Sequence, residues 1–367
     1  MPAAMLASLL PVATMAAPTP PPPSAWRLPE VDWAAGGHRM PVPHLPSATV
    51  RAVDAVVWPA DNATYAYTDI TSSSGVEVGV FRSQDGLSGW QYHGIAVHRN
   101  TSAADVREVG TPAALVKGSR VFVYFKYTAA NGTRGIGIAA ADHPLGPFAR
   151  LAPAAPAPEN FHRPYGPGGI FDDTQVFQHE GRLHLFHSRK WSTDTPGCIS
   201  NAQTGRNDCI EWMVSDDATT WTRRGVVLAA NDPRVGPRNC TSADKGLSCI
   251  PGGLEPMSAR IYGDTLVLLT DGRAFSVFVA PVSRLASDDA AGLRFEKADE
   301  AFLAPYTYAN LPTDYVATAL RVLPRSGEPR SCGISQSTGG LSFVVYPLKS
   351  SAAPAETHEG ESKPGSL

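Results

Sequence analysis

Three stretches of the chain place carboxylic acids among apolar neighbours. Asp54 stands in an Ala-Val-Asp-Ala-Val-Val run, Glu255 in Gly-Leu-Glu-Pro-Met, and Asp172 and Asp173 in Ile-Phe-Asp-Asp-Thr-Gln-Val-Phe. An isolated ionised carboxylate in such surroundings costs several kcal/mol, so each acid needs a partner, hydrogen bonds or a proton. Carboxyls that share one cavity repel each other, which pushes their pKa values apart. One protonated and one ionised acid are what hydrolysis of a glycosidic bond requires.

The composition predicts a chain of many short strands. The 367 residues are 43% hydrophobic and only 18% charged, and they include 33 Gly and 33 Pro. This length allows one large domain or two ordinary ones, and such a turn-rich composition favours strands over long helices. The net charge of −3, without a basic stripe, argues against nucleic acid or a membrane surface as the partner.

A repeat organises these strands. Short β-rich runs recur at residues 65–69, 121–127, 183–187, 266–269 and 341–346. Similar units begin at Asp54, Thr111, Asp173, Glu255 and Asp314, with spacings of 57, 62, 82 and 59 residues. A fixed period built from strands alone predicts an all-β, five-bladed β-propeller, with a pair of irregular β-sandwiches as the alternative. The first strand of each propeller blade lines the central channel, so the acids should meet at its mouth.

A turn ending in an aromatic residue recurs late in three of the units. It reads Ser-Gln-Asp-Gly-Leu-Ser-Gly-Trp at residues 83–90, Asp-His-Pro-Leu-Gly-Pro-Phe at 142–148, and Ser-Asp-Asp-Ala-Thr-Thr-Trp at 215–221. Repeated turn chemistry is typical of propeller blades and not of sandwiches.

Several of these motifs resemble one known group of enzymes. Asp173-Thr-Gln-Val-Phe, followed by Glu180-Gly-Arg-Leu-His-Leu, resembles the blade-three motif of five-bladed glycoside hydrolases of family 43. Residues 135–148 are similar to that family's end of blade two, and Glu255-Pro-Met to its acid-bearing blade four. Residues 172–190 are also similar to the related family 117, which acts on anhydrogalactose-containing algal oligosaccharides. The resemblance covers residues 50–348 and implies cleavage of O-glycosidic bonds in oligo- or polysaccharides.

The resemblance also implies a role for each acid. Asp54 matches the general base that activates water, and Glu255 matches the general acid that protonates the departing oxygen. Asp173, rather than Asp172, matches the aspartate that tunes the acid's pKa and orients the substrate. Such a three-carboxylate site implies inversion. The family's usual Pro is missing after Asp54 and Asp173, and Pro follows Glu255 directly, which leaves a catalytically inactive, glycan-binding propeller as the alternative.

Other side chains are candidates for substrate binding. His187 and Arg189 end the predicted blade-three strand pair, where they either bind sugar hydroxyls, a uronate or a sulfate, or face solvent. Trp58, Trp191 and Trp212 are either sugar-stacking platforms or core residues. No cofactor is predicted and no metal ligand is assigned; relatives often hold calcium in the channel, but the sequence gives no ligand set for it.

The chain divides into four predicted segments. Residues 1–17 form an uncharged apolar stretch that we interpret as a signal peptide, 18–49 are Pro-rich, 50–349 form the propeller, and 350–367 a disordered tail. No later segment is apolar and long enough to cross a membrane. Four sequons support a secreted glycoprotein, at Asn62, Asn100, Asn131 and Asn239.

Cysteine usage fits the same oxidising compartment. Cys198 with Cys209, and Cys240 with Cys249, would close two short polar loops as disulfides, leaving Cys332 as a buried small hydrophobe. Five cysteines permit other pairings, and the sequence does not choose among them. The oligomeric state is not predicted.

Overall fold

The computed structural model describes most of the predicted domain. The described residues are 38–41, 49–99, 108–128, 134–151, 170–190, 209–229, 232, 234, 254–270, 276–298, 320–323, 331–336 and 342–347. Within them the protein is all-β, and the 3₁₀ helix η2 (Val282–Ala286) is the sole helical element. No helix in this part of the chain has the length and apolar character needed to cross a membrane. The predicted signal peptide and tail lie outside the described residues.

The first half of the fold is an eight-stranded sheet made of two antiparallel meanders. One contains β2 (Thr49–Trp58), β3 (Ala63–Ser72), β4 (Gly75–Ser83) and β5 (Gln91–Val97). The other contains β6 (Glu108–Lys117), β7 (Arg120–Thr128), β8 (Arg134–Ala141) and β9 (Ala149–Leu151). A parallel pair, Val76 with Glu108, joins the two meanders.

Three four-stranded antiparallel sheets follow. The first contains β10 (Ile170–His179), β11 (Arg182–Lys190), β12 (Cys209–Ser215) and β13 (Thr222–Ala229). The second contains β14 (Pro256–Tyr262), β15 (Thr265–Thr270), β16 (Ser276–Pro281) and β17 (Glu296–Lys297). The third contains β18 (Leu320–Leu323), β19 (Ser331–Gln336), β20 (Ser342–Pro347) and β1 (His38–Arg39). β1 comes from the Pro-rich segment 18–49 and pairs with β20, so both ends of the described chain share one sheet.

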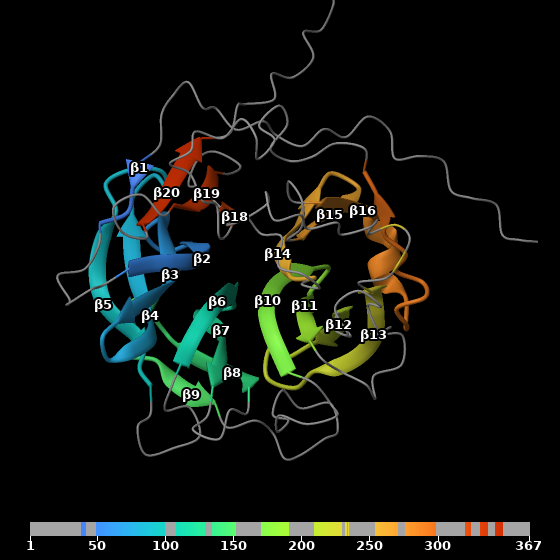
Figure 1. Cartoon of the computed structure of the whole chain (residues 1–367), viewed down its shortest axis with the longest axis horizontal. Coiled ribbons are helices and arrows are strands. Elements are labelled where there is room, and N and C mark those ends of the chain that lie inside the picture. The colour runs from blue at the N-terminus through green and yellow to red at the C-terminus, as the bar shows by residue number, and fades with distance from the viewer. Residues whose placement is uncertain are drawn as a thin grey trace, which may run out of the picture.

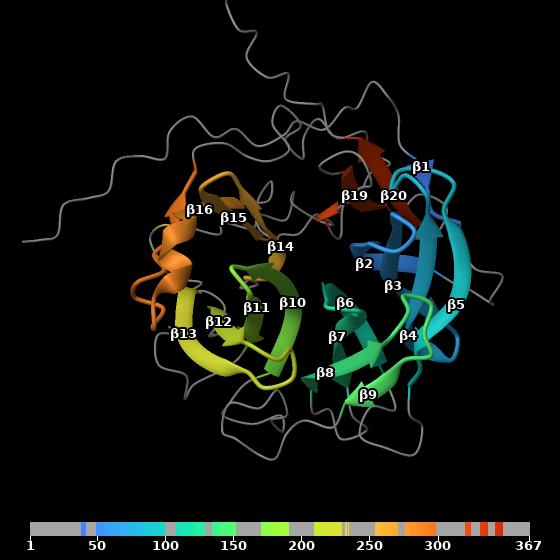
Figure 2. The same cartoon turned by 180° about the vertical axis from the view of Figure 1, so that it is seen from behind.

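The sheets stand in a ring around a common centre (Figure 1), and the view from behind shows the same arrangement (Figure 2). The innermost strands are β2, β6, β10, β14 and β18. Each contacts the next in this order, and β18 contacts β2. This closed ring of first strands is a propeller-like architecture.

Apolar side chains fill the spaces between neighbouring sheets. One core cluster, with Tyr65 and Phe125, joins the β2–β5 and β6–β9 meanders. A second, with Tyr124 and Leu185, joins β6–β9 to the β10 sheet, and a third, with Trp212, joins the β10 sheet to the β14 sheet. Burial of both faces explains why the strands read as nearly continuous apolar runs rather than as alternating ones.

Two of the three recurring aromatic turns connect their own sheet to the preceding one. Tyr67 of β3 donates its hydroxyl to the carbonyl of Pro144, at 2.9 Å, and its ring packs edge-on against Phe148. Tyr124 of β7 does the same with the carbonyl of Ala218, at 2.9 Å, and the ring of Trp221. Phe148 and Trp221 are therefore the residues of these turns that pack against the preceding sheet.

Two of these turns share their hydrogen bonds as well. Asp85 Oδ1 accepts the N–H groups of Leu87 and Ser88, both at 2.8 Å. Asp217 Oδ1 accepts those of Thr219 and Thr220 in the same way, at 2.8 and 2.6 Å. An aspartate that caps its own turn is the physical reason for the motif.

Candidate active site

An irregularity near the N-terminal end marks four of the innermost strands. The pairing register shifts between Val50 and Val53 in β2, between Gly110 and Ala113 in β6, between Asp172 and Thr174 in β10, and between Pro256 and Ser258 in β14. β-Bulges re-aim side chains and are common next to active sites. The predicted acids all lie within two residues of these bulges.

Asp54 follows the β2 bulge and ties three innermost strands together. It has no exposed surface. Its Oδ1 accepts the N–H of Ala55 at 2.9 Å and Nη2 of Arg260, on β14, at 2.8 Å. Its Oδ2 accepts the N–H of Ala114, on β6, at 3.0 Å. These donors compensate the burial of the charge, and they leave one lone pair of Oδ2 for a further donor such as water.

Asp173 is the extra residue of the β10 bulge. Asp172 pairs with Ser188 and Thr174 with His187, so the pairing register shifts at Asp173, which is the residue inserted in the bulge. Its side chain is 8% exposed. The bulge is a physical reason why two adjacent aspartates can have different surroundings, although the side chain of Asp172 lies outside what the structure describes.

Glu255 lies immediately before β14 and is half-buried. Its neighbours Leu254 and Met257 are buried, at 0% and 4% exposure, in agreement with the apolar surroundings expected from the sequence. Arg260, which binds Asp54, follows on the same strand. β14 therefore brings Glu255 into the same ring of innermost strands as Asp54.

Two functional candidates were missed by the sequence analysis. Arg260 lies among small and apolar residues in β14. This pattern indicates only that Arg260 is on one face of a strand, and it does not point to a functional role. Asp69 ends an apolar run of β3, which is the same signal that singled out Asp54, and its carboxyl interacts electrostatically with that of Asp173.

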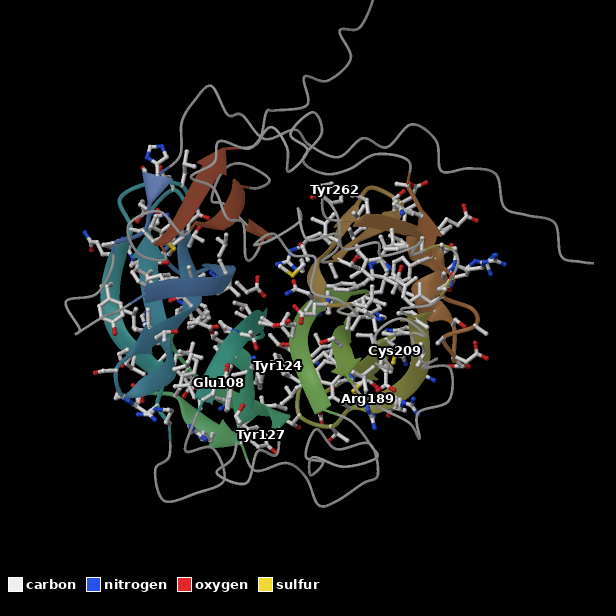
Figure 3. All side chains as sticks on the ribbon, in the orientation of Figure 1. Glu108, Tyr124, Tyr127, Arg189, Cys209 and Tyr262 are labelled. Carbon is white, nitrogen blue, oxygen red and sulfur yellow. The ribbon has the colours of Figure 1, made fainter. Side chains whose placement is uncertain are left out.

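His187 and Arg189 belong to a buried charge network. Their side chains are 0% and 4% exposed, and both face Glu211 of β12, at 3.4 and 3.6 Å. Arg223 of β13 contacts the other Glu211 oxygen at 2.5 Å. Figure 3 labels Arg189 on the β11–β12 side of the ring. Solvent exposure, one of the two alternatives for this pair, is therefore wrong.

The network explains the ionisation of Glu211. Burial alone would raise the pKa of this carboxyl, but the hydrogen bond from His187 and the charges of His187, Arg189 and Arg223 outweigh it and lower the pKa to about 2. Because His187 pairs with Thr174, the network lies directly beside the bulge that carries Asp173.

The tryptophans divide between packing and undescribed positions. Trp58 is 8% exposed, lies in a core cluster and packs edge-on against His143. Trp212 is fully buried and donates its indole N–H to His184 at 3.2 Å. The structure gives both rings a packing role and offers neither face to a sugar. Trp191 lies outside the described residues.

The remaining site predictions are only partly covered. Cys209 is fully buried at the start of β12, whereas Cys198, Cys240 and Cys249 lie outside the described residues, so the disulfide pairing stays a prediction. Asn62 is exposed in the β2–β3 turn; the other three predicted glycosylation sites, Asn100, Asn131 and Asn239, are not described. Among the described residues, no three His, Cys, Asp or Glu side chains gather as a metal site.

No protein-family profile and no curated protein sequence matches the chain. Solved structures match its fold. Zg3597, a family 117 glycoside hydrolase from the marine bacterium Zobellia galactanivorans, is 12% identical with a TM-score of 0.53, over 85% of this chain and 89% of that one. A GH43_1 enzyme from Xanthomonas citri is 16% identical with a TM-score of 0.56, over 86% and 92%.

The Xanthomonas citri enzyme complexed with xylotriose is also similar, with 15% identity and a TM-score of 0.54, over 85% of this chain and 89% of that one. The likeness to families 43 and 117 that the motifs indicated is thus confirmed for the fold, which is that of the propeller glycoside hydrolases.

Proposed function

We propose that the protein is a glycoside hydrolase that cleaves O-glycosidic bonds of oligo- or polysaccharides. The observation that carries this proposal is that Asp54, Asp173 and Glu255 lie beside bulges at the same end of the innermost strands, in a fold shared with families 43 and 117. The proposal includes five blades: the two meanders of the eight-stranded sheet count separately, because a single parallel pair joins them.

The proposed reaction is a single displacement with inversion. Asp54 takes a proton from water as the water oxygen attacks the anomeric carbon. Glu255 gives its proton to the glycosidic oxygen as the bond to that carbon breaks, so the products are a free sugar and an alcohol. Asp173 orients the substrate and influences Glu255 through its charge. Room for the water requires the carboxyls of Asp54 and Glu255 to be roughly 6.5–9.5 Å apart in the working complex. No cofactor takes part.

Mutagenesis of the acids tests the assignment. Glu255→Gln and Asp54→Asn should each abolish hydrolysis while near-UV circular dichroism stays that of the wild type. Asp142→Asn is the matched control, because Asp142 lies in an exposed turn, paired with Arg120 at the surface, and should keep full activity. Full activity in either acid variant would refute the assignment.

The substrate class and stereochemistry need their own measurements. The screen should include plant pentosans, xylotriose and red-algal galactan oligosaccharides, since xylotriose is bound by one similar structure. NMR detection of the first anomer released separates inversion from retention. A retaining outcome would remove Asp54 from the role of base.

One observation favours a second candidate, a glycan-binding propeller without turnover. Asp54 has no exposed surface and already accepts three N–H groups, which is also how a purely structural carboxylate is held. Such a protein would bind a glycan in calorimetry with the same affinity in the wild type and in Glu255→Gln, and neither would release sugar. We further propose that the protein is secreted, as the N-terminal segment and the sequons indicate.

A further inference from the structure

Asp69 is a buried acid that the proposed reaction does not use. It lies on β3, one strand outward from Asp54, and is 6% exposed. The β2 bulge, between Val50 and Val53, lies opposite it, because those two residues pair with Ile70 and Thr68. A carboxylic acid at such a place needs a physical reason.

The carboxyl of Asp69 holds the N-terminal part of β6. Its Oδ1 accepts the N–H of Thr111 at 2.5 Å. Thr111 has φ of 44°, a left-handed conformation that a β-branched residue rarely adopts. Gly110 allows the close approach: a Cβ there would lie 2.9 Å from the Asp69 oxygen. The bond therefore fixes a strained backbone that would otherwise relax.

Two carboxylates secure the two ends of the same bulge. Asp69 binds the N–H of Thr111 and Asp54 binds the N–H of Ala114, and the register of β6 shifts between Gly110 and Ala113. Displacement of the β6 bulge would thus move Ala114, whose N–H binds Asp54, the proposed base on β2.

The charges around Asp69 come from three strands. Burial raises the pKa of its carboxyl, and the charges of Glu108 on β6 and Asp173 on β10 raise it further. Lys126 on β7 and the Thr111 hydrogen bond act in the opposite direction, and the result is a pKa of about 7. Lys126 is shared, because its Nζ also lies 3.2 Å from Glu108.

We propose that Asp69 is a positioning residue of the candidate site: it holds the β6 bulge through Thr111, and its charge state sets the electrostatic environment of Asp173. This inference rests on the proposed function for its catalytic meaning, but its structural content can be measured without any substrate. An uncharged Asp69 leaves Asp173 as the only negative group of the pair, whereas an ionised Asp69 repels it.

NMR on protein labelled with ¹³C at the aspartate carboxyls is the decisive experiment. In the wild type, one carboxyl signal should titrate near pH 7, and the Thr111 amide and the Asp173 carboxyl should shift with the same midpoint. Asp69→Asn keeps an oxygen acceptor for Thr111 but cannot ionise, so all three transitions should vanish. Asp85→Asn, which alters a turn carboxyl with similar backbone bonds away from the site, should leave them unchanged. An Asp173 signal that titrates identically in the wild type and in Asp69→Asn would overturn the proposal.

Thermal unfolding gives a second readout with a definite sign. The folded pKa of Asp69 lies above the unfolded value of 3.8, so its contribution to stability is fully present below that value and is lost as pH rises through 7. Asp69→Asn should therefore melt higher than the wild type at pH 8, by about 5 °C, and not at pH 4. A lower melting temperature at pH 8 would contradict the assignment.

Hydrolysis of xylotriose separates this inference from the proposed function. Asp69→Ala, which frees the Thr111 amide, should lower kcat/KM about tenfold. In the wild type, kcat/KM should decline above pH 7 as Asp69 ionises. For Asp69→Asn, kcat/KM should stay within about twofold of the wild-type value at pH 5 and should not decline above pH 7. Wild-type activity in Asp69→Ala would refute the positioning role. If the wild type does not cleave xylotriose, the proposed function fails for that substrate, and the NMR titration still decides the role of Asp69.

Discussion

Replacing Arg260 by Met tests whether the ion pair with Asp54 holds the centre of the ring together. Arg260 Nη2 lies 2.8 Å from Asp54 Oδ1, the Asp54 side chain has no exposed surface, and that of Arg260 is 16% exposed. Arg260→Met keeps an unbranched apolar stem of similar reach and removes the charge. We expect the free energy of unfolding to fall by about 3–5 kcal/mol, the usual cost of leaving a buried charge without its partner.

The distance supports a loss of this size. Two unit charges 2.8 Å apart attract each other by roughly 6 kcal/mol at an effective dielectric constant of about 20. Part of this attraction is offset because both groups are solvated in the unfolded chain. The N–H groups of Ala55 and Ala114 remain on the carboxylate in the variant, which keeps the loss below the full Coulomb energy.

A double-mutant cycle measured by urea unfolding isolates the pair. Asp54→Asn alone removes the need for a counter-ion, so adding Arg260→Met to it should cost only about 1–2 kcal/mol more, which corresponds to a coupling energy of about 2–3 kcal/mol. The control is Arg120→Met, whose ion pair with Asp142 is largely exposed and should be worth less than about 1 kcal/mol. Additivity of the Asp54 and Arg260 effects within about 0.5 kcal/mol would refute the reasoning.

Two further predictions concern the sheets that support the site. The pKa of Glu211 is about 2 in the folded protein and 4.5 ordinarily, so the stabilisation that its charge provides is present above pH 4.5 and is lost as pH falls toward 2. Glu211→Gln should therefore lower the free energy of unfolding in urea by on the order of 3 kcal/mol at pH 7. An equal loss at pH 2 would contradict this. Gly137→Ala should lower the free energy of unfolding by about 1–3 kcal/mol, because its Cβ would lie 2.4 Å from the buried Phe125 ring. Gly118→Asn is the control and should be nearly neutral, because Gly118 lies in a turn with φ of 61° and open space around it. Equal losses of stability in the two variants would refute the packing argument.

The sequence predicted the strand order because local chemistry repeats with the fold. Three glycines, Gly118, Gly181 and Gly263, lie in the tight turns that connect a first strand to a second, and all three have positive φ. The acids were found because a charge in an apolar run is costly wherever it lies. Both signals are contained in a few neighbouring residues, so no knowledge of the tertiary structure was needed.

The sequence could not predict which charges meet across the ring. Asp54 and Arg260 are separated by about 200 residues, and their pairing follows only from closure of the sheets around one axis. Asp69 was passed over because it lies at the end of the β-rich run predicted at residues 65–69, where an acid usually faces water, whereas β3 continues to Ser72 and the β6 bulge beside Asp69 belongs to another meander. His187 and Arg189 gave no hint of Glu211, because cross-strand registers depend on connections whose length the sequence does not fix.

The pairing of β1 with β20 sets the order in which this protein can be completed during synthesis. His38 and Arg39 meet Val345 and Val344, so the sheet that closes the ring draws its strands from opposite ends of the described chain. While the ribosome is still producing the last strands, β1 has no partner, and β18 has not taken its place beside β2. Closure of so long a loop is entropically the most demanding step of the fold. The ring of innermost strands and the β1–β20 pair can therefore be completed only after translation has passed β20, although the described donors to Asp54 all precede β18.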